Sequence, residues 1–102
     1  MQWFDVFSQP IELTEERWQH IVTEHPEVSE HKEKIPVVLA DPDYVKRSQR
    51  DEHVILYYRY FTDILDGKYL LIVVKKDQAR SFILTGYVTR SVMRGETLWE
   101  RS

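Results

Sequence analysis

The chain has 102 residues, of which 42% are hydrophobic and 30% charged, and its formal net charge is −3. A chain of this length builds one core, so we expect residues 1–102 to form a single domain. The absence of cysteine excludes disulfides and thiolate metal ligands, and no apolar stretch approaches the roughly 20 residues that span a bilayer.

The small net charge conceals two unlike parts. Residues 1–45 contain ten acidic and three basic residues, a balance of −7, whereas residues 46–102 contain eleven basic and seven acidic ones, a balance of +4. Such asymmetry is typical of a polyanion-binding surface backed by an acidic body, although a functionless uneven surface gives the same balance. The first residues lack a basic segment followed by a long apolar one, so we expect a cytoplasmic protein without membrane contact.

The first part of the chain predicts two short extended segments and then helices. Residues 3–7 and 11–13 look extended, with a turn between them. Thr14 is a good helix N-cap, and an apolar helix face with i, i+3, i+4, i+7 spacing follows at Trp18, Ile21, Val22 and His25. Pro26 ends or kinks that helix. A second helix is expected to continue to about residue 40, with a break near residues 34–35 because of Pro36.

The remaining residues predict strands. Residues 44–48, 53–61, 68–76 and 79–90 are rich in the residues that strands prefer, and residues 97–99 add a short edge piece. In the last long strand, period-two alternation predicts that one face, the core side, carries Phe82, Leu84 and Val88. We therefore expect an α+β fold, in which helices pack on one face of an antiparallel meander.

Two histidines on the first helix are candidate proton-transfer groups. His25 ends the apolar face, so it should point at the sheet from a helix C-terminus, where positive charge is favoured. The alternative is a capping or core histidine. His20 falls on the wetter face and is otherwise a plain surface residue. The two are five positions apart instead of the four typical of a helical metal pair, so we expect no metal site and no cofactor.

Cations and hydroxyls in the strands are candidate phosphate ligands. Arg59 interrupts a tyrosine-rich strand and must reach solvent or a partner, because an unpaired buried charge is costly. It could clamp a phosphate while Tyr58 stacks on a base, or it could lie over tyrosine rings without a ligand. The hydroxyls of Thr85, Tyr87 and Thr89 share the other face of the last strand and could bind phosphate, or they could simply be a solvated sheet face.

Five segments together resemble a known nuclease group. They are Leu13-Thr-Glu-Glu-Arg17-Trp18-x-His20-Ile21-x4-His25-Pro26-Glu27, Asp41-Pro42-Asp43-x-Val45-x-Arg47-Ser48, Tyr57-Tyr58-Arg59, Val73-Val74-Lys75 and Ile83-x-Thr85-x-Tyr87-x-Thr89-Arg90. Their order and spacing resemble a phage-associated domain family of the barnase–EndoU–colicin E5/D–RelE-like nuclease fold.

The resemblance implies a metal-independent ribonuclease fold, in which N-terminal helices pack on one face of a curved antiparallel sheet of about four strands and the site lies on the sheet face. It combines a helix histidine, a strand cation and a hydroxyl of the last strand. The catalytic residues it implies are His25, Arg59, Thr85 and His20, and the substrate-binding residues are Arg47, Tyr58, Lys75, Tyr87, Thr89 and Arg90. We accordingly expect an endoribonuclease that acts by attack of the RNA 2′-hydroxyl, as the toxin of a bacterial toxin–antitoxin pair with a small antitoxin protein as partner. The alternative is a non-catalytic RNA- or protein-binding module that uses the same sheet face.

Overall fold

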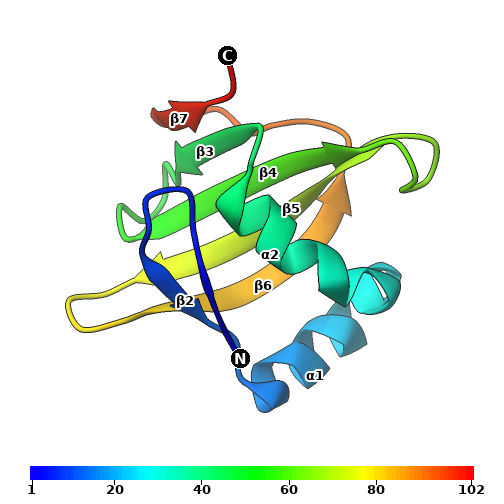
Figure 1. Cartoon of the computed structure of the whole chain (residues 1–102), viewed down its shortest axis with the longest axis horizontal. Coiled ribbons are helices and arrows are strands. Elements are labelled where there is room, and N and C mark those ends of the chain that lie inside the picture. Colours follow the sequence, from blue (N-terminus) through cyan, green and yellow to red (C-terminus); the bar gives the residue numbers. More distant parts are fainter.

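A curled sheet of seven strands carries every helix on one of its faces (Figure 1). The computed structural model describes residues 1–102. The strands are β1 (Gln2–Phe4), β2 (Pro10–Glu12), β3 (Tyr44–Arg47), β4 (Val54–Phe61), β5 (Lys68–Lys76), β6 (Ser81–Thr89) and β7 (Thr97–Glu100). The helices are α1 (Glu15–Glu24), the 3₁₀ helix η1 (Pro26–Lys34) and α2 (Ile35–Ala40). None of them has the length and apolar character needed to cross a bilayer.

The expected antiparallel sheet of about four strands behind N-terminal helices is wrong. The sheet is mixed, with the order β1-β2-β6-β5-β4-β3-β7, and two of its strands precede the helices. β1 pairs with β2, and β2 then joins β6 in parallel through Glu12 and Phe82. At the other edge, β3 pairs with both β4 and β7. Three-residue strands are too short to show alternation, and pairing between opposite ends of the chain is not a local property of the sequence.

Local signals do place the helices correctly. Thr14 is the N-cap of α1, because its Oγ1 accepts a hydrogen bond of 3.1 Å from the backbone N–H of Arg17. α1 ends just before Pro26, which begins η1. The predicted break near residues 34–35 is where η1 gives way to α2. Pro36 lies in the first turn of α2, where a missing N–H costs no helical hydrogen bond.

The two faces of the sheet bury different clusters. On the helix side, 16 buried residues form the main core, including Trp18 and Ile21 of α1 and Tyr57 of β4. On the opposite face, three buried residues, Leu56, Tyr58 and Leu71, form a smaller cluster without any helix residue. The segment between β6 and β7 covers this second cluster: Val92 packs against it, and the N–H of Met93 donates to Tyr58 Oη over 3.1 Å.

A β-bulge in β6 changes which of its residues face the core. Val73 lies opposite Thr85 while the next residue, Val74, lies opposite Ile83, so Leu84 has no direct partner. An extra residue of this kind shifts the alternation of side chains. Ile83 is consequently buried in the main core, with Val88 packed against it. The prediction that Phe82, Leu84 and Val88 share the core side is right only for Val88.

The N-terminal hairpin is held to the sheet by one buried carboxylate. The side chain of Asp5 is 0% exposed and lies 3.1 Å from Lys76 Nζ. It also accepts hydrogen bonds from Tyr57 Oη and from the backbone N–H groups of Phe7 and Gln9. Burial first, and then the bond to Asp5, raise the pKa of Tyr57. Asp5 thereby joins the loop between β1 and β2 to β4 and β5.

Candidate functional site

Tyrosines dominate the sheet face that has no helix. Of the six tyrosines in the chain, only Tyr57 belongs to the helix-side core. The other five pack on or beside the smaller cluster, and we call this surface the tyrosine face: Tyr44, Tyr58, Tyr60, Tyr69 and Tyr87. Alternation along β4 explains the division, because side chains at successive positions point to opposite faces. Tyr58 and Tyr60 therefore lie on the tyrosine face, and Arg59 lies on the helix side.

Tyr69 of β5 is the centre of this aromatic group. Its ring packs edge to face against the rings of Tyr44, Tyr58 and Tyr60, with centroid distances of 6.4, 6.0 and 5.3 Å. Burial raises the pKa of Tyr69, and the neighbouring Tyr44 and Asp43 act in the same direction. Beside these rings is a surface hollow of about 280 Å³, lined by Asp43, Tyr44, Tyr60, Tyr69 and Arg101.

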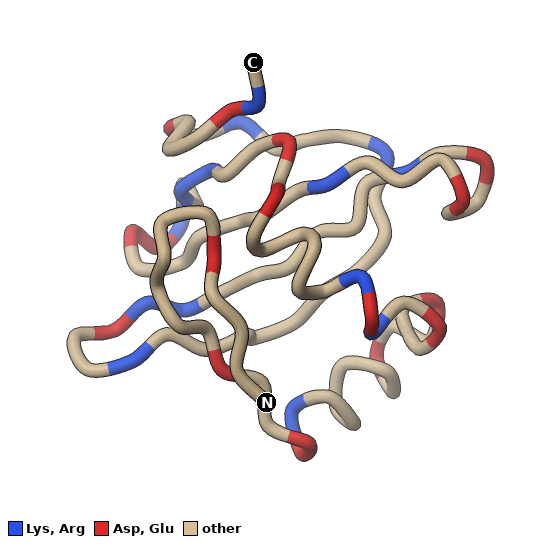
Figure 2. Tube along the Cα trace, viewed as in Figure 1, with Lys and Arg blue, Asp and Glu red and all other residues tan.

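Cations without an acidic partner flank the tyrosine face. Lys46 Nζ lies 5.7 Å from the centroid of the Tyr44 ring and donates a 2.7 Å hydrogen bond to Thr97 Oγ1. Arg90 and Arg94 lie in the segment after β6, where both are exposed. The helices α1 and η1 carry six acidic and three basic residues, whereas the rest of the chain carries eleven of each, and Figure 2 shows acidic as well as basic residues along the strands and their loops. The two helices therefore have a net charge of −3, and the strands and loops together are neutral.

The structure brings the predicted histidine at the end of α1 to the ring of Tyr87 in β6. The imidazole of His25 stacks on the ring of Tyr87, with a centroid distance of 5.1 Å and an interplanar angle of 29°. His25 Nδ1 is also 3.8 Å from a carboxylate oxygen of Glu27, and the two side chains are 34% and 38% exposed. Water and a ligand can therefore reach His25 and Glu27 beside Tyr87, at the edge of β6. His20 lies apart from it, 62% exposed and 4.0 Å from Glu16.

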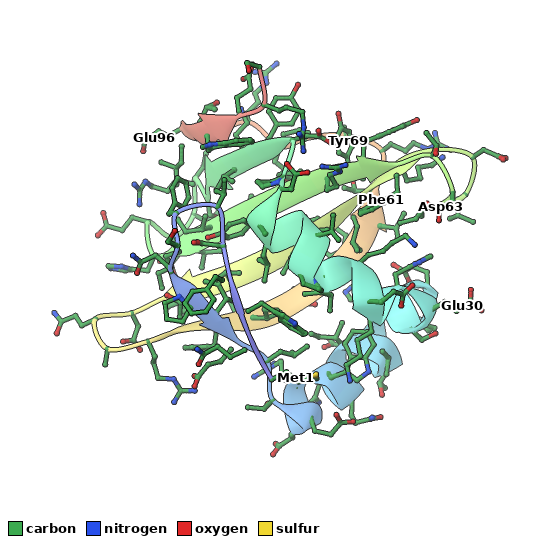
Figure 3. The ribbon with its side chains drawn as sticks, in the orientation of Figure 1. Met1, Glu30, Phe61, Asp63, Tyr69 and Glu96 are labelled. Atoms are coloured by element: carbon green, nitrogen blue, oxygen red, sulfur yellow. The ribbon has the colours of Figure 1, made fainter.

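Two other predicted catalytic residues, Arg59 and Thr85, have polar groups that are paired or buried. Arg59 Nη1 donates to the side chain and the carbonyl of Asp41, over 2.8 and 2.7 Å, and its guanidinium lies over Phe61, which is labelled in Figure 3. Asp41 also accepts from Arg101, whose hydrogen bond is the main cause of its lowered pKa. Thr85 Oγ1 is buried without a hydrogen-bond partner, and Thr85 and His31 both line a small cavity beside Trp18. Arg59 and Thr85 are therefore not available to a substrate bound at His25.

The predicted substrate-binding residues also divide into two groups. Lys75 and Arg47 are neutralised, by Asp51 at 2.6 Å and by Glu96 at 2.8 Å respectively. Tyr58 is fully buried. The remaining three, Tyr87, Thr89 and Arg90, follow one another along the end of β6, and Thr89 lies directly opposite Tyr69. Of these three residues, the structure brings Tyr87 into contact with His25, and Thr89 and Arg90 follow it in the chain.

The hollow beside Tyr69 was missed by the sequence reasoning. Alternation in Tyr58-Arg59-Tyr60 indicates that two tyrosines share a face, and this signal was present in the sequence. The contribution of Tyr44 and Tyr69 depends on the registers of β3 with β4 and of β4 with β5. Arg101 follows the last strand and gives no sequence signal at all, because only the fold returns it to Asp41 and Asp43.

No protein-family model matches this chain, and comparisons with curated proteins and with solved structures give no match either. The resemblance to the nuclease group therefore stays a prediction made from the residues themselves.

Proposed function

We propose that this protein is a metal-independent endoribonuclease whose reaction centre is the His25–Tyr87 pair. The observation that carries the proposal is the stacking of a partly exposed imidazole on a strand phenol, with Glu27 beside the imidazole. Histidine is the most common proton-transfer group in catalysis, and a carboxylate beside it helps to orient the ring. Arg90, three residues after Tyr87, is an exposed cation that can approach a phosphate.

The tyrosine face supplies the surface for the rest of the RNA strand. Aromatic rings stack on unpaired bases, and lysine and arginine contact the phosphates. Tyr60 and Tyr69 supply such rings, while Lys46 and Arg94 supply cations without an acidic partner. The helices α1 and η1 carry a net charge of −3, whereas the rest of the chain is neutral overall, so an RNA strand on the tyrosine face avoids this negative part of the surface.

The proposed reaction transfers a phosphoryl group within the RNA. The ribose 2′-oxygen forms a bond to the adjacent phosphorus while the bond from phosphorus to the 5′-oxygen of the next nucleotide breaks. His25 takes the proton of the 2′-hydroxyl, and the phenol of Tyr87 gives a proton to the leaving 5′-oxygen. Proton return from His25 to Tyr87 restores the pair. The products are a 2′,3′-cyclic phosphate and a free 5′-hydroxyl, and Arg90 neutralises charge on the phosphorane.

Cleavage of a fluorescent single-stranded RNA in the presence of a chelator tests the proposal, with free RNA and with RNA engaged by ribosomes. We expect His25→Ala and Tyr87→Phe each to lower the rate by about 10²–10⁴-fold, the range typical of an acid–base group. His20→Ala is the matched control, because it removes an exposed histidine from the same helix. Equal rates for His25→Ala and wild type in both forms of the assay would disprove the role of His25.

A second candidate is a non-catalytic RNA-binding module on the same face. The observation that favours it is the engagement of Arg59 by Asp41 and the burial of the Thr85 hydroxyl, which leave the reaction centre without two groups implied by the resemblance. Saturable RNA binding by wild type, with no product under either condition, would select this function over the nuclease.

The resemblance also implies a toxin with a small antitoxin partner, and we propose this as the biological setting of the nuclease. Induced expression in a bacterial host should then arrest growth, and His25→Ala should relieve the arrest while His20→Ala does not. Growth arrest that is equal for wild type and His25→Ala would argue against a toxin that works through RNA cleavage.

A further inference from the structure

The hollow beside Tyr69 displays hydrogen-bonding groups that the protein does not use. Of the five tyrosines on the tyrosine face, Tyr58 has its hydroxyl bonded to the backbone of Met93. The hydroxyls of Tyr44, Tyr60 and Tyr69 make no hydrogen bond within the protein, and all three residues line the hollow. Tyr60 is 45% exposed, so a ligand has direct access to its ring. A flat ligand with polar edges would satisfy both the rings and their hydroxyls.

Arg101 is held rigidly at the same hollow. Its Nε donates to Asp43 Oδ1 over 2.8 Å, and its Nη2 donates to Asp41 Oδ1 over 2.7 Å and to the Asp41 carbonyl over 2.8 Å. Its Nη1 has no partner in the protein and remains able to donate to a ligand. Both oxygens of Asp43 are already used, the second by the backbone N–H of Tyr60 at 2.7 Å. The lining therefore offers mainly donors, together with hydroxyls that can act either way.

A glycine keeps Tyr60 in place beside the hollow. Gly67 lies in the turn between β4 and β5 with φ of +110°, and a Cβ at this position would collide with the phenol of Tyr60. Only glycine adopts this backbone conformation readily while leaving room for the ring. The position of the Tyr60 ring in the lining therefore depends on a glycine in this turn.

We propose that this hollow binds a nucleobase of single-stranded RNA, at a distance from the reaction centre that the same strand can span. The inference rests on the proposed RNA substrate and names a second point of contact for it. Tyr69 lies opposite Thr89, two positions along β6 from Tyr87, and the hollow extends across β4 to β3. With strands about 4.8 Å apart, three strand spacings place its far side roughly 14 Å from β6.

The lining favours bases whose edges present carbonyl oxygens. Uracil and guanine carry such acceptors at positions that Arg101 and the phenol hydroxyls can reach as donors, whereas adenine lacks a carbonyl oxygen. Three tyrosines can also surround a methylated ammonium group. Asp43 and Arg101 both line the hollow and are paired with each other, so the lining has no unpaired carboxylate to hold a cation, and the nucleobase is the favoured occupant.

Titration of ¹³C-tyrosine-labelled protein with nucleoside 5′-monophosphates tests this by NMR, because each tyrosine reports its own surroundings. We expect UMP and GMP to shift the resonances of Tyr44, Tyr60 and Tyr69 more than AMP does. Tyr60→Ala should weaken UMP binding about 5- to 150-fold, the equivalent of one base–aromatic stack. Phe4→Ala is the matched control, because Phe4 is an aromatic side chain 60% exposed on β1, five strands away from β3 in the sheet.

The outcomes separate this inference from the proposed function. His25→Ala should lower the cleavage rate by about 10²–10⁴-fold and leave the UMP-induced shifts unchanged, whereas Tyr60→Ala should raise KM for a short RNA more than it lowers kcat. Cleavage that depends on His25, with no nucleotide-induced shift at the three tyrosines, would overturn the inference and leave the nuclease intact. Shifts without cleavage would support the inference and favour the non-catalytic module. Shifts with tetramethylammonium but with no nucleotide would identify a cation site and overturn it.

Discussion

Replacing Asp5 by alanine should destabilise the fold more than any other removal of a single acidic group. Its side chain is fully buried and accepts hydrogen bonds from Tyr57 Oη, Lys76 Nζ and two backbone N–H groups. Asp5→Ala leaves the buried hydroxyl of Tyr57 unpaired, at a cost of about 1–3 kcal/mol. Lys76 is 27% exposed and can turn to water, so its loss is smaller. With the unpaired N–H groups of Phe7 and Gln9 added to the stranded phenol, the total should be about 3–5 kcal/mol.

A double-mutant cycle isolates the contact between Asp5 and Tyr57. Tyr57→Phe removes the same hydrogen bond and should cost about 1.5–3 kcal/mol, because the acceptor is charged. In the double variant no phenol hydroxyl is left unpaired. The loss in free energy of unfolding of the double variant should therefore be smaller than the sum of the two single losses by a similar amount. Urea unfolding followed by tryptophan fluorescence measures these energies, since Trp3 lies in the anchored hairpin and Trp18 lies in the core.

An exposed acidic residue on α1 serves as the control for Asp5. Glu24 is an exposed acid near the end of α1, so Glu24→Ala should change the free energy of unfolding by no more than about 0.5 kcal/mol. Costs of Asp5→Ala and Tyr57→Phe that add to within about 0.5 kcal/mol would show that the two groups are not coupled. The assignment of Asp5 as the anchor of the hairpin would then be wrong.

Three further predictions follow from the charges and turns of the fold. Hydrogen bonding from Arg101 holds the pKa of Asp41 below its usual value. The stability that the ionised Asp41 contributes is therefore present above about pH 4 and is lost as pH falls through the lower folded-state pKa. The urea midpoint should fall more between about pH 5 and about pH 2 for wild type than for Asp41→Asn. Burial raises the pKa of Tyr57, so the stability that its protonated form contributes is lost as pH rises above about 10. Tyr57→Phe should therefore reduce the loss of stability at alkaline pH. In wild type, tyrosinate absorbance should appear together with unfolding. Gly67→Ala should cost about 1–3 kcal/mol in urea unfolding, because φ there is +110° and the new methyl group meets Tyr60, and it should also weaken UMP binding at the hollow.

Much of the local structure could be predicted from the sequence. Thr14 caps α1, Pro26 ends it, and Pro36 marks the start of α2, because each acts through the backbone within one turn of itself. The long strands at 54–61 and 68–76 agree with the predicted strands to within one residue, because their β-branched and aromatic residues favour extended backbone. The exposure of His20 follows from helical periodicity in the same way.

Properties that depend on pairing could not be predicted in this way. The short β1 and β2 become part of the sheet only by meeting β6, and the bulge at Leu84 arises from a register set by β5. The bulge decides that Ile83, and not Phe82 or Leu84, enters the core. Strand count and facing residues are therefore tertiary properties, because a shift of one residue exchanges the two faces of a strand.

The candidate site divides along the same line. The sequence by itself determined which residue types were available and that His25 would point toward the sheet from the end of a helix. Only the tertiary structure decided that His25 meets Tyr87, that Arg59 is taken by Asp41, and that a hollow forms around Tyr69. Propensity and periodicity act over a few residues, whereas partners of a charge or a ring are chosen by packing between segments far apart in the chain.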